Sequence, residues 1–149
     1  MKKFLLAVMS LMLVSVPAFA GGGLNVFLDN LNVEAGVDLP GFSARISSQF
    51  GVPVPRVQAV VGAVAEPADA FMVFQLGQMT GMQNDRVLSV YQANRGKGWG
   101  VIAQKLGIKP GSKEFHALKR GDFVLAGGPA GKAKAGKGMG KGTGKGHKK

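Results

Sequence analysis

The chain has 149 residues, a formal net charge of +11 and no cysteine. This length suits one domain with a short extension, and the lack of cysteine excludes a disulfide-held fold and any thiol nucleophile. Hydrophobic residues make up 46% of the chain, which is enough to build a core without covalent support.

Residues 1–20 have the pattern of a secretory signal peptide. Lys2 and Lys3 form a basic start, Phe4 to Val16 is almost entirely apolar, and Ala18 to Ala20 matches the small-residue cleavage pattern. The apolar run is shorter than the ~20 residues that a membrane-spanning helix needs, so we expect cleavage before Gly21 rather than anchoring. The mature protein is therefore predicted to be periplasmic or secreted.

Residues 21–41 are compatible with either a helix or a strand. A helical face would present Leu24, Phe27, Leu28 and Leu31. The apolar residues of 26–33 also suit short strands. Gly36, Pro40 and Gly41 then predict a loop before the next element.

Four further helices are predicted in the residues that follow. The first ends at Gly51, and the second carries Pro55 in its first turn. Pro67 opens the third, which ends at Thr80, and Asn84 with Asp85 caps the fourth. Expected core positions are Phe42, Ile46, Phe50, Val57, Val60, Val61, Val64, Phe71, Met72, Phe74, Met79, Val87, Leu88, Val90 and Tyr91. Helices of about ten residues joined by short turns predict an all-α orthogonal bundle.

The most informative stretch is Gly96 to Asp122, which holds the single tryptophan of the chain. One helical face is predicted from Trp99, Ile102, Ala103 and Leu106. Gly107 is suited to end that helix in a left-handed conformation, and Pro110 prevents its continuation. Ser112 is placed to cap a second helix, which Gly121 ends.

The sequence GWGxIAxxLGIKPGSxxFHxLK over residues 98–119 resembles the carboxy-terminal motif of a family of small exported bacterial proteins of uncharacterised activity. The resemblance is strongest over residues 67–122. It implies an exported helical protein and carries no chemistry of its own.

Ile102 to Ile108 is also similar to the first helix and turn of a helix-turn-helix DNA-binding unit, because Ala103 and Gly107 have the small-residue spacing of such a turn. The connection through Lys109 to Gly111 is longer than usual. Predicted export favours an ordinary helical hairpin. Nucleic-acid binding by the helix pair at 99–120, extended by the basic carboxy terminus, is the alternative.

The carboxy terminus, Gly127 to Lys149, carries seven lysines, no acidic residue and no aromatic residue. This composition predicts a disordered tail, here called the basic tail. The candidate polyanion-binding residues are Lys132, Lys134, Lys137, Lys141, Lys145, Lys148 and Lys149. Expected partners are lipopolysaccharide or another anionic membrane surface, teichoic acid, acidic polysaccharide and extracellular DNA, held by charge without base recognition.

No pattern of catalytic or metal-binding residues emerges. A serine-based triad would depend on His116, because His147 lies in the basic tail, and no GxSxG or HExxH sequence is present. Met72, Met79 and Met82 are soft ligands in principle, but methionines at such spacing more often fill a core. We therefore expect a non-enzymatic protein without cofactor or metal.

Overall fold

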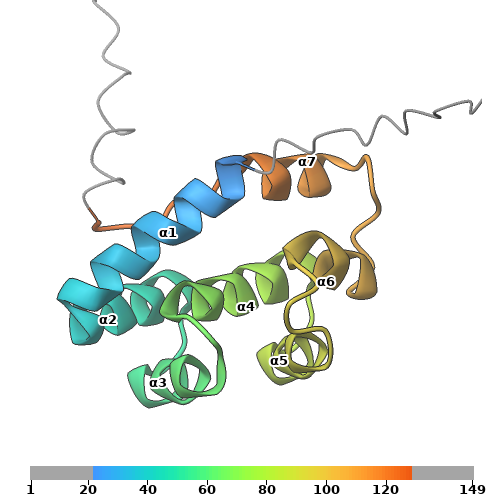
Figure 1. The fold of residues 1–149 in the computed structure, drawn as a ribbon. Helices are drawn as coiled ribbons and strands as arrows, with labels where there is room; N and C mark the ends of the chain where they lie inside the picture. Colours follow the sequence, from blue (N-terminus) through green and yellow to red (C-terminus); the bar gives the residue numbers. More distant parts are fainter. Residues whose placement is uncertain (1–21, 129–149) are drawn as a thin grey trace, which may run out of the picture.

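A computed structural model describes residues 22–128, and within them the chain forms seven α-helices and no strand (Figure 1). The all-α prediction is confirmed. The helices are α1 (Gly22–Val37), α2 (Leu39–Phe50), α3 (Val54–Ala63), α4 (Pro67–Thr80), α5 (Asn84–Ala93), α6 (Trp99–Lys105) and α7 (Lys113–Arg120). The predicted signal peptide lies outside the described residues, and so does the basic tail from residue 129 onward.

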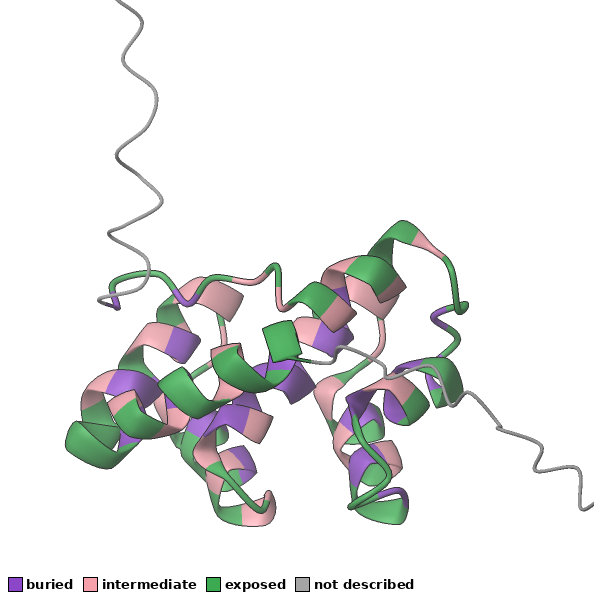
Figure 2. Ribbon diagram, turned by 45° about the horizontal axis from the view of Figure 1, so that its top comes forward, coloured by how far each residue is buried: buried purple, intermediate pink, exposed green. Residues whose placement is uncertain are grey.

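Helix α4 is the centre of the bundle and contacts α1, α2, α3 and α5. Its buried residues are Ala68, Ala70, Phe71, Met72, Val73, Phe74, Leu76 and Gly77. A helix that is apolar on nearly every side needs neighbours all round, and these neighbours turn their buried faces toward it (Figure 2). In Figure 1, α3 and α5 are seen nearly end-on while α4 runs across the view, as expected for an orthogonal bundle.

Within residues 22–128, no single helix is long and apolar enough to cross a membrane. Helices α3 and α4 are long and apolar enough for this only when they are taken together, and the chain bends by 116° at the break between them.

Residues 22–37 are helical, so the first of the two interpretations is correct. The loop predicted from Gly36, Pro40 and Gly41 was wrong, because α1 continues to Val37 and α2 begins two residues later. Asp38 separates the helices, and its Oδ1 accepts a hydrogen bond of 2.9 Å from the Gly41 amide. Pro40 lies in the first turn of α2. A backbone N–H at this position would have no acceptor within the helix, so the N–H that proline lacks is not needed there.

The predicted core positions lie inside the bundle. Those that are fully buried are Phe42, Ile46, Val57, Val60, Phe71, Met72, Phe74, Val87 and Tyr91. Those that are half-buried against this core are Phe50, Val61, Val64, Met79, Leu88 and Val90. Edge-on ring contacts join three helices, because the Phe71 ring centroid lies 5.2 Å from that of Phe27 and 5.6 Å from that of Phe50.

The helix ends predicted around α6 and α7 are confirmed. Gly107 has φ +91°, its amide donates to the Gln104 carbonyl at 3.0 Å, and the Ile108 amide donates to Ala103 at 2.9 Å. These are the two bonds of a Schellman motif. The Ser112 side chain accepts a bond of 3.1 Å from the Phe115 amide, which caps α7.

The cap predicted for α5 was wrong. Gln83 precedes the helix without a side-chain cap, and Asn84 is the first helical residue. The Asn84 side chain instead packs over α4 at Gly77, where an added Cβ would collide with Asn84 Oδ1. Tertiary packing thus uses a side chain that the local pattern assigned to capping.

Residues 121–128, here called the C-terminal strap, run back from α7 past α1 toward α2 (Figure 1). Gln49 of α2 holds the strap at two points, donating to the Val124 carbonyl at 3.0 Å and accepting from the Ala126 amide at 2.8 Å. Arg45 pairs with Glu34 at 2.8 Å, and a Cβ at Gly128 would collide with Arg45. The packed domain therefore extends two residues beyond the predicted boundary at Ala126.

Candidate functional site

The seven lysines predicted to bind polyanions all lie outside the described residues, so the structure gives no geometry for them. It does show the second half of the domain as a basic surface. The exposed cations that form no ion pair with another described residue are Arg86, Arg95, Lys97, Lys105, Lys109 and Lys113. Arg120 pairs with Asp122 at 2.6 Å.

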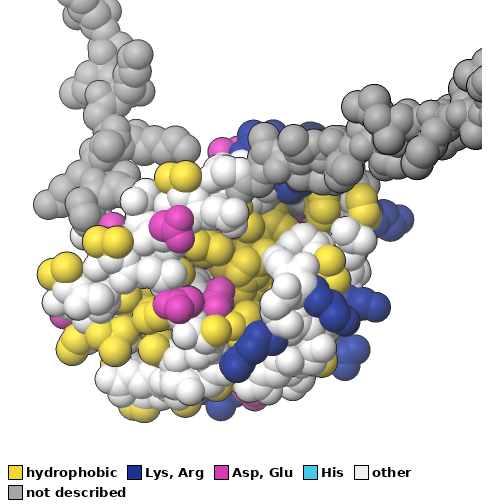
Figure 3. Space-filling model, viewed as in Figure 1, with side chains coloured by type: hydrophobic (Ala, Val, Ile, Leu, Met, Phe, Trp, Pro, Cys, Tyr) yellow, Lys and Arg dark blue, Asp and Glu magenta, His cyan; other side chains and the backbone are white. Residues whose placement is uncertain are grey.

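A groove of about 540 Å³ lies between the start of α1, α6 and α7, and is here called the α1–α6–α7 groove. Its lining is mainly apolar and includes Leu24, Trp99, Val101, Phe115 and Leu118, together with Lys97 and Lys119. In Figure 3, hydrophobic side chains occupy a hollow between α1 and α6. Lys and Arg side chains gather on the α5 and α6 side of this hollow, and acidic side chains lie on its α1 side.

A polar cluster lies behind this groove and joins α4, α5 and α6. Asp69 is in the first turn of α4, and its Oδ1 accepts a bond of 3.1 Å from the indole N–H of Trp99. Its Oδ2 accepts a bond of 2.7 Å from the hydroxyl of Tyr91. The Tyr91 and Trp99 rings stack with centroids 5.2 Å apart. The predicted burial of Trp99 is confirmed, at 9% exposure, and one carboxylate satisfies both aromatic donors.

The same cluster fixes the turn between α3 and α4. The Tyr91 hydroxyl accepts a bond of 3.0 Å from the Ala65 amide, and Arg95 donates to the Ala63 carbonyl at 3.1 Å while lying over the Tyr91 ring. Burial is the main cause that raises the pKa of Tyr91, and the hydrogen bond to Asp69 adds to it. The phenol therefore stays protonated at neutral pH as a donor, and the cluster does not activate it as a base.

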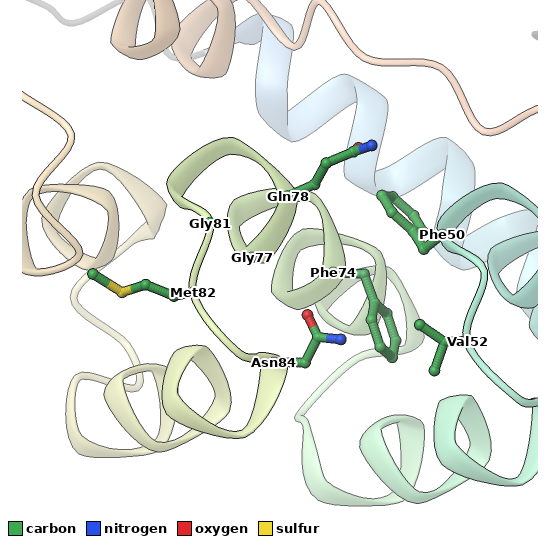
Figure 4. Close-up of a pocket in the computed structure, with 8 residues that line it drawn as sticks. All are labelled: Phe50, Val52, Phe74, Gly77, Gln78, Gly81, Met82 and Asn84. Atoms are coloured by element: carbon green, nitrogen blue, oxygen red, sulfur yellow. The ribbon is translucent and has the colours of Figure 1, made fainter.

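A second pocket, of about 310 Å³, lies where α2, α4 and α5 meet (Figure 4). Figure 4 shows the Phe50, Val52 and Phe74 side chains grouped together, with Asn84 beside them and Met82 pointing away from them. Its lining has no charged side chain. Nothing in this pocket provides a group for acid–base or nucleophilic chemistry.

The residues considered for catalysis and metal binding are not brought together. His116 is exposed on α7, and the described residues contain no group of three His, Asp or Glu side chains that could hold a metal ion. Met72 is buried in the core, and Met79 and Met82 are half-buried against it. The methionines therefore contribute to packing, as their spacing indicates.

Comparisons with protein-family models, with curated proteins and with solved structures each gave no match. The resemblance of residues 98–119 to a family of exported bacterial proteins remains a prediction.

Sequence reasoning missed the polar cluster and the groove. Tyr91 was expected only as a core residue. Trp99 and Tyr91 lie 30 and 22 positions from Asp69, so no local spacing connects them. One available signal was donor chemistry, because the indole N–H of a buried Trp and the hydroxyl of a buried Tyr each need a hydrogen-bond acceptor.

Proposed function

We propose that the protein is an exported, non-enzymatic binding protein that holds anionic polymers by charge. The observation that supports this most directly is the separation of charge along the chain. Residues 22–85 carry two basic and six acidic residues, whereas residues 86–149 carry fifteen basic and two acidic residues. A surface of one sign attracts polymers of the other sign and speeds their encounter.

The described part of the basic half supports a contact without sequence recognition. Most of its cations are lysines, and those at 97, 105, 109 and 113 are exposed. Lysine acts as a point charge and lacks the planar fork with which arginine reads a defined geometry. Lipopolysaccharide, acidic polysaccharide and extracellular DNA all present the repeated phosphate, sulfate or carboxylate groups that such a surface neutralises.

The test compares the mature chain with a chain that ends at Gly128, on immobilised heparin, lipopolysaccharide and duplex DNA across a salt series. Truncation should leave helicity and melting temperature nearly unchanged, because the C-terminal strap is kept whole. Binding at low salt should fall strongly. On DNA, the logarithm of the binding constant falls linearly with the logarithm of the salt concentration. This slope should become shallower by roughly 0.7–0.9 for each phosphate that the shorter chain no longer neutralises.

The matched control is the full-length chain with the seven tail lysines changed to glutamine, which keeps the length and removes the charge. It should bind as weakly as the truncated chain. If the truncated chain binds as tightly as the full chain and salt has little effect, the charge mechanism is wrong. A strong preference for DNA that survives truncation would instead support the helix pair of α6 and α7 as a nucleic-acid site.

Export is tested separately by the intact mass of the protein purified from its native host. The expected mature chain begins at Gly21. Recovery of the chain from the cytoplasm still beginning at Met1 would contradict export and favour the nucleic-acid alternative.

A further inference from the structure

The α1–α6–α7 groove is a binding surface of a different kind from the basic tail. Its volume of about 540 Å³ falls in the range of roughly 300–1,000 Å³ typical of small-molecule sites. Three helices supply its apolar walls, with Leu24 from α1, Trp99 from α6, and Phe115 and Leu118 from α7. An extended apolar ligand would thus be covered from several sides.

The charged residues of this groove are all of one sign. Lys97 and Lys119 line it, and no acidic residue does. The Lys119 ammonium lies 5.8 Å from the ring centroid of Phe115, so a cation stands directly beside an apolar wall. Lys97 is exposed and forms no ion pair with another described residue. Apolar walls with cations beside them are complementary to an amphiphile whose polar end is anionic.

From this complementarity we propose that the α1–α6–α7 groove binds a free fatty acid. The alkyl chain lies against Trp99, Phe115 and Leu118, and the carboxylate lies at Lys97 and Lys119. The volume is that of one small ligand, so the groove takes a single alkyl chain rather than the two chains of a phospholipid. This site differs from the polyanion binding proposed above because it uses neither the basic tail nor a polymer, although Lys97 belongs to both surfaces.

The first experiment titrates the mature full-length chain with saturated fatty acids of eight, ten and twelve carbons below their micelle concentrations. Trp99 lines the groove and is the single tryptophan, so its fluorescence reports binding, and calorimetry gives the affinity. Affinity should rise about fourfold for each methylene added until the groove is full. The alcohol of equal length should bind about two- to fivefold more weakly, because it lacks the charge.

The second experiment distinguishes the contribution of the apolar walls to affinity from that of the lysine charges. Gly100 lies in α6 and lines the groove, and a Cβ there would meet only Phe115, at 3.8 Å. Gly100→Leu should therefore fill the groove and weaken the binding of acid and alcohol alike by about fifteenfold, the equivalent of roughly two methylenes. Gly36→Leu is the matched control, because Gly36 lies in α1 with open space around it.

To test the charges, Lys97→Gln should lower the affinity for the fatty acid about two- to fivefold and leave the affinity for the alcohol unchanged. Lys113→Gln, an exposed lysine outside the groove lining, should change neither. Val101→Glu provides a second blocking variant if Gly100→Leu loses helicity, because Val101 is 36% exposed and the new carboxylate repels that of the ligand.

The proposal is overturned if affinity does not depend on chain length, or if Gly36→Leu weakens binding as much as Gly100→Leu. It is also overturned if the protein binds vesicles of anionic phospholipid and no monomeric fatty acid, because the groove would then be part of a membrane-facing surface. Loss of polymer binding in the tail variants leaves these titrations unaffected, so the two proposals fail independently.

Discussion

Replacing Asp69 with alanine should destabilise the domain far more than a surface carboxylate normally does. The change leaves the indole N–H of Trp99 and the hydroxyl of Tyr91 without their acceptor. A hydrogen bond to a charged group contributes about 1.5–3 kcal/mol to stability. The two bonds together would contribute about 3–6 kcal/mol if no water replaced them. Asp69 is only half-buried, and water can replace part of this, so we expect a loss of about 2–4 kcal/mol.

Urea denaturation followed by circular dichroism and by Trp99 fluorescence measures this loss. At about 4 °C per kcal/mol for a domain of this size, the melting temperature should fall by roughly 8–16 °C. Asp85→Ala is the matched control, because Asp85 lies in the first turn of α5 and its ion pair with Arg56 is exposed. It should cost no more than about 1 kcal/mol.

A double-mutant cycle tests the mechanism itself. Tyr91→Phe should cost less in the Asp69→Ala background than in the wild type, because the hydroxyl has already lost its acceptor there. If the two effects add within about 0.3–0.5 kcal/mol, the residues are not coupled and the role assigned to Asp69 is wrong.

Three further predictions concern the same packing. Trp99→Ala should cost about 3–5 kcal/mol, and an unshifted melting curve together with solvent-exposed Trp fluorescence in the wild type would contradict its place in the core. Gly121→Ala should destabilise by more than ~1 kcal/mol, because Gly121 has φ +65° and a Cβ would press on the Gly23 backbone, whereas Gly62→Ala in open space on α3 should be neutral or stabilising. The pKa of Tyr91 is raised above 10 in the folded protein, so its protonated form contributes fully to stability below pH 10, and this contribution is lost as pH rises through the folded pKa. Tyr91→Phe should remove this loss of stability at alkaline pH. The absorbance of tyrosinate, measured at the single tyrosine, should titrate above pH 10.

Local signals were sufficient where a structure depends on neighbours within one or two turns. The face of Trp99 in α6, the left-handed end at Gly107 and the cap at Ser112 each follow from residues three to seven positions apart, and all three predictions were confirmed. Proline signals are ambiguous by comparison. Pro40 was interpreted as part of a loop, yet the same residue is favoured in the first turn of a helix, and α2 uses it in that way.

Features that depend on distant residues could not be predicted in this way. The amide of Ala68 at the start of α4 donates to Asn32 Oδ1 of α1 at 2.8 Å, across 36 positions. Nothing in the residues around Asn32 indicates that it supports another helix. The walls of the α1–α6–α7 groove come from both ends of the domain, at Leu24 and Leu118, so only the folded arrangement shows it.

The C-terminal strap has a consequence for the order in which the domain folds. The Ala126 amide and Gln49 are 77 positions apart, and Gly23 of α1 touches Gly121 after α7, so these contacts close nearly all of the described residues 22–128 into one loop. Contacts of such long range form late, because their loop entropy must be offset by earlier packing. Helices α2 to α5 can assemble around each other while the chain is still emerging from a ribosome. The α1–α6–α7 groove can exist only after α7 packs against α1 and α6, so ligand binding there would report that the two ends of the domain have come together.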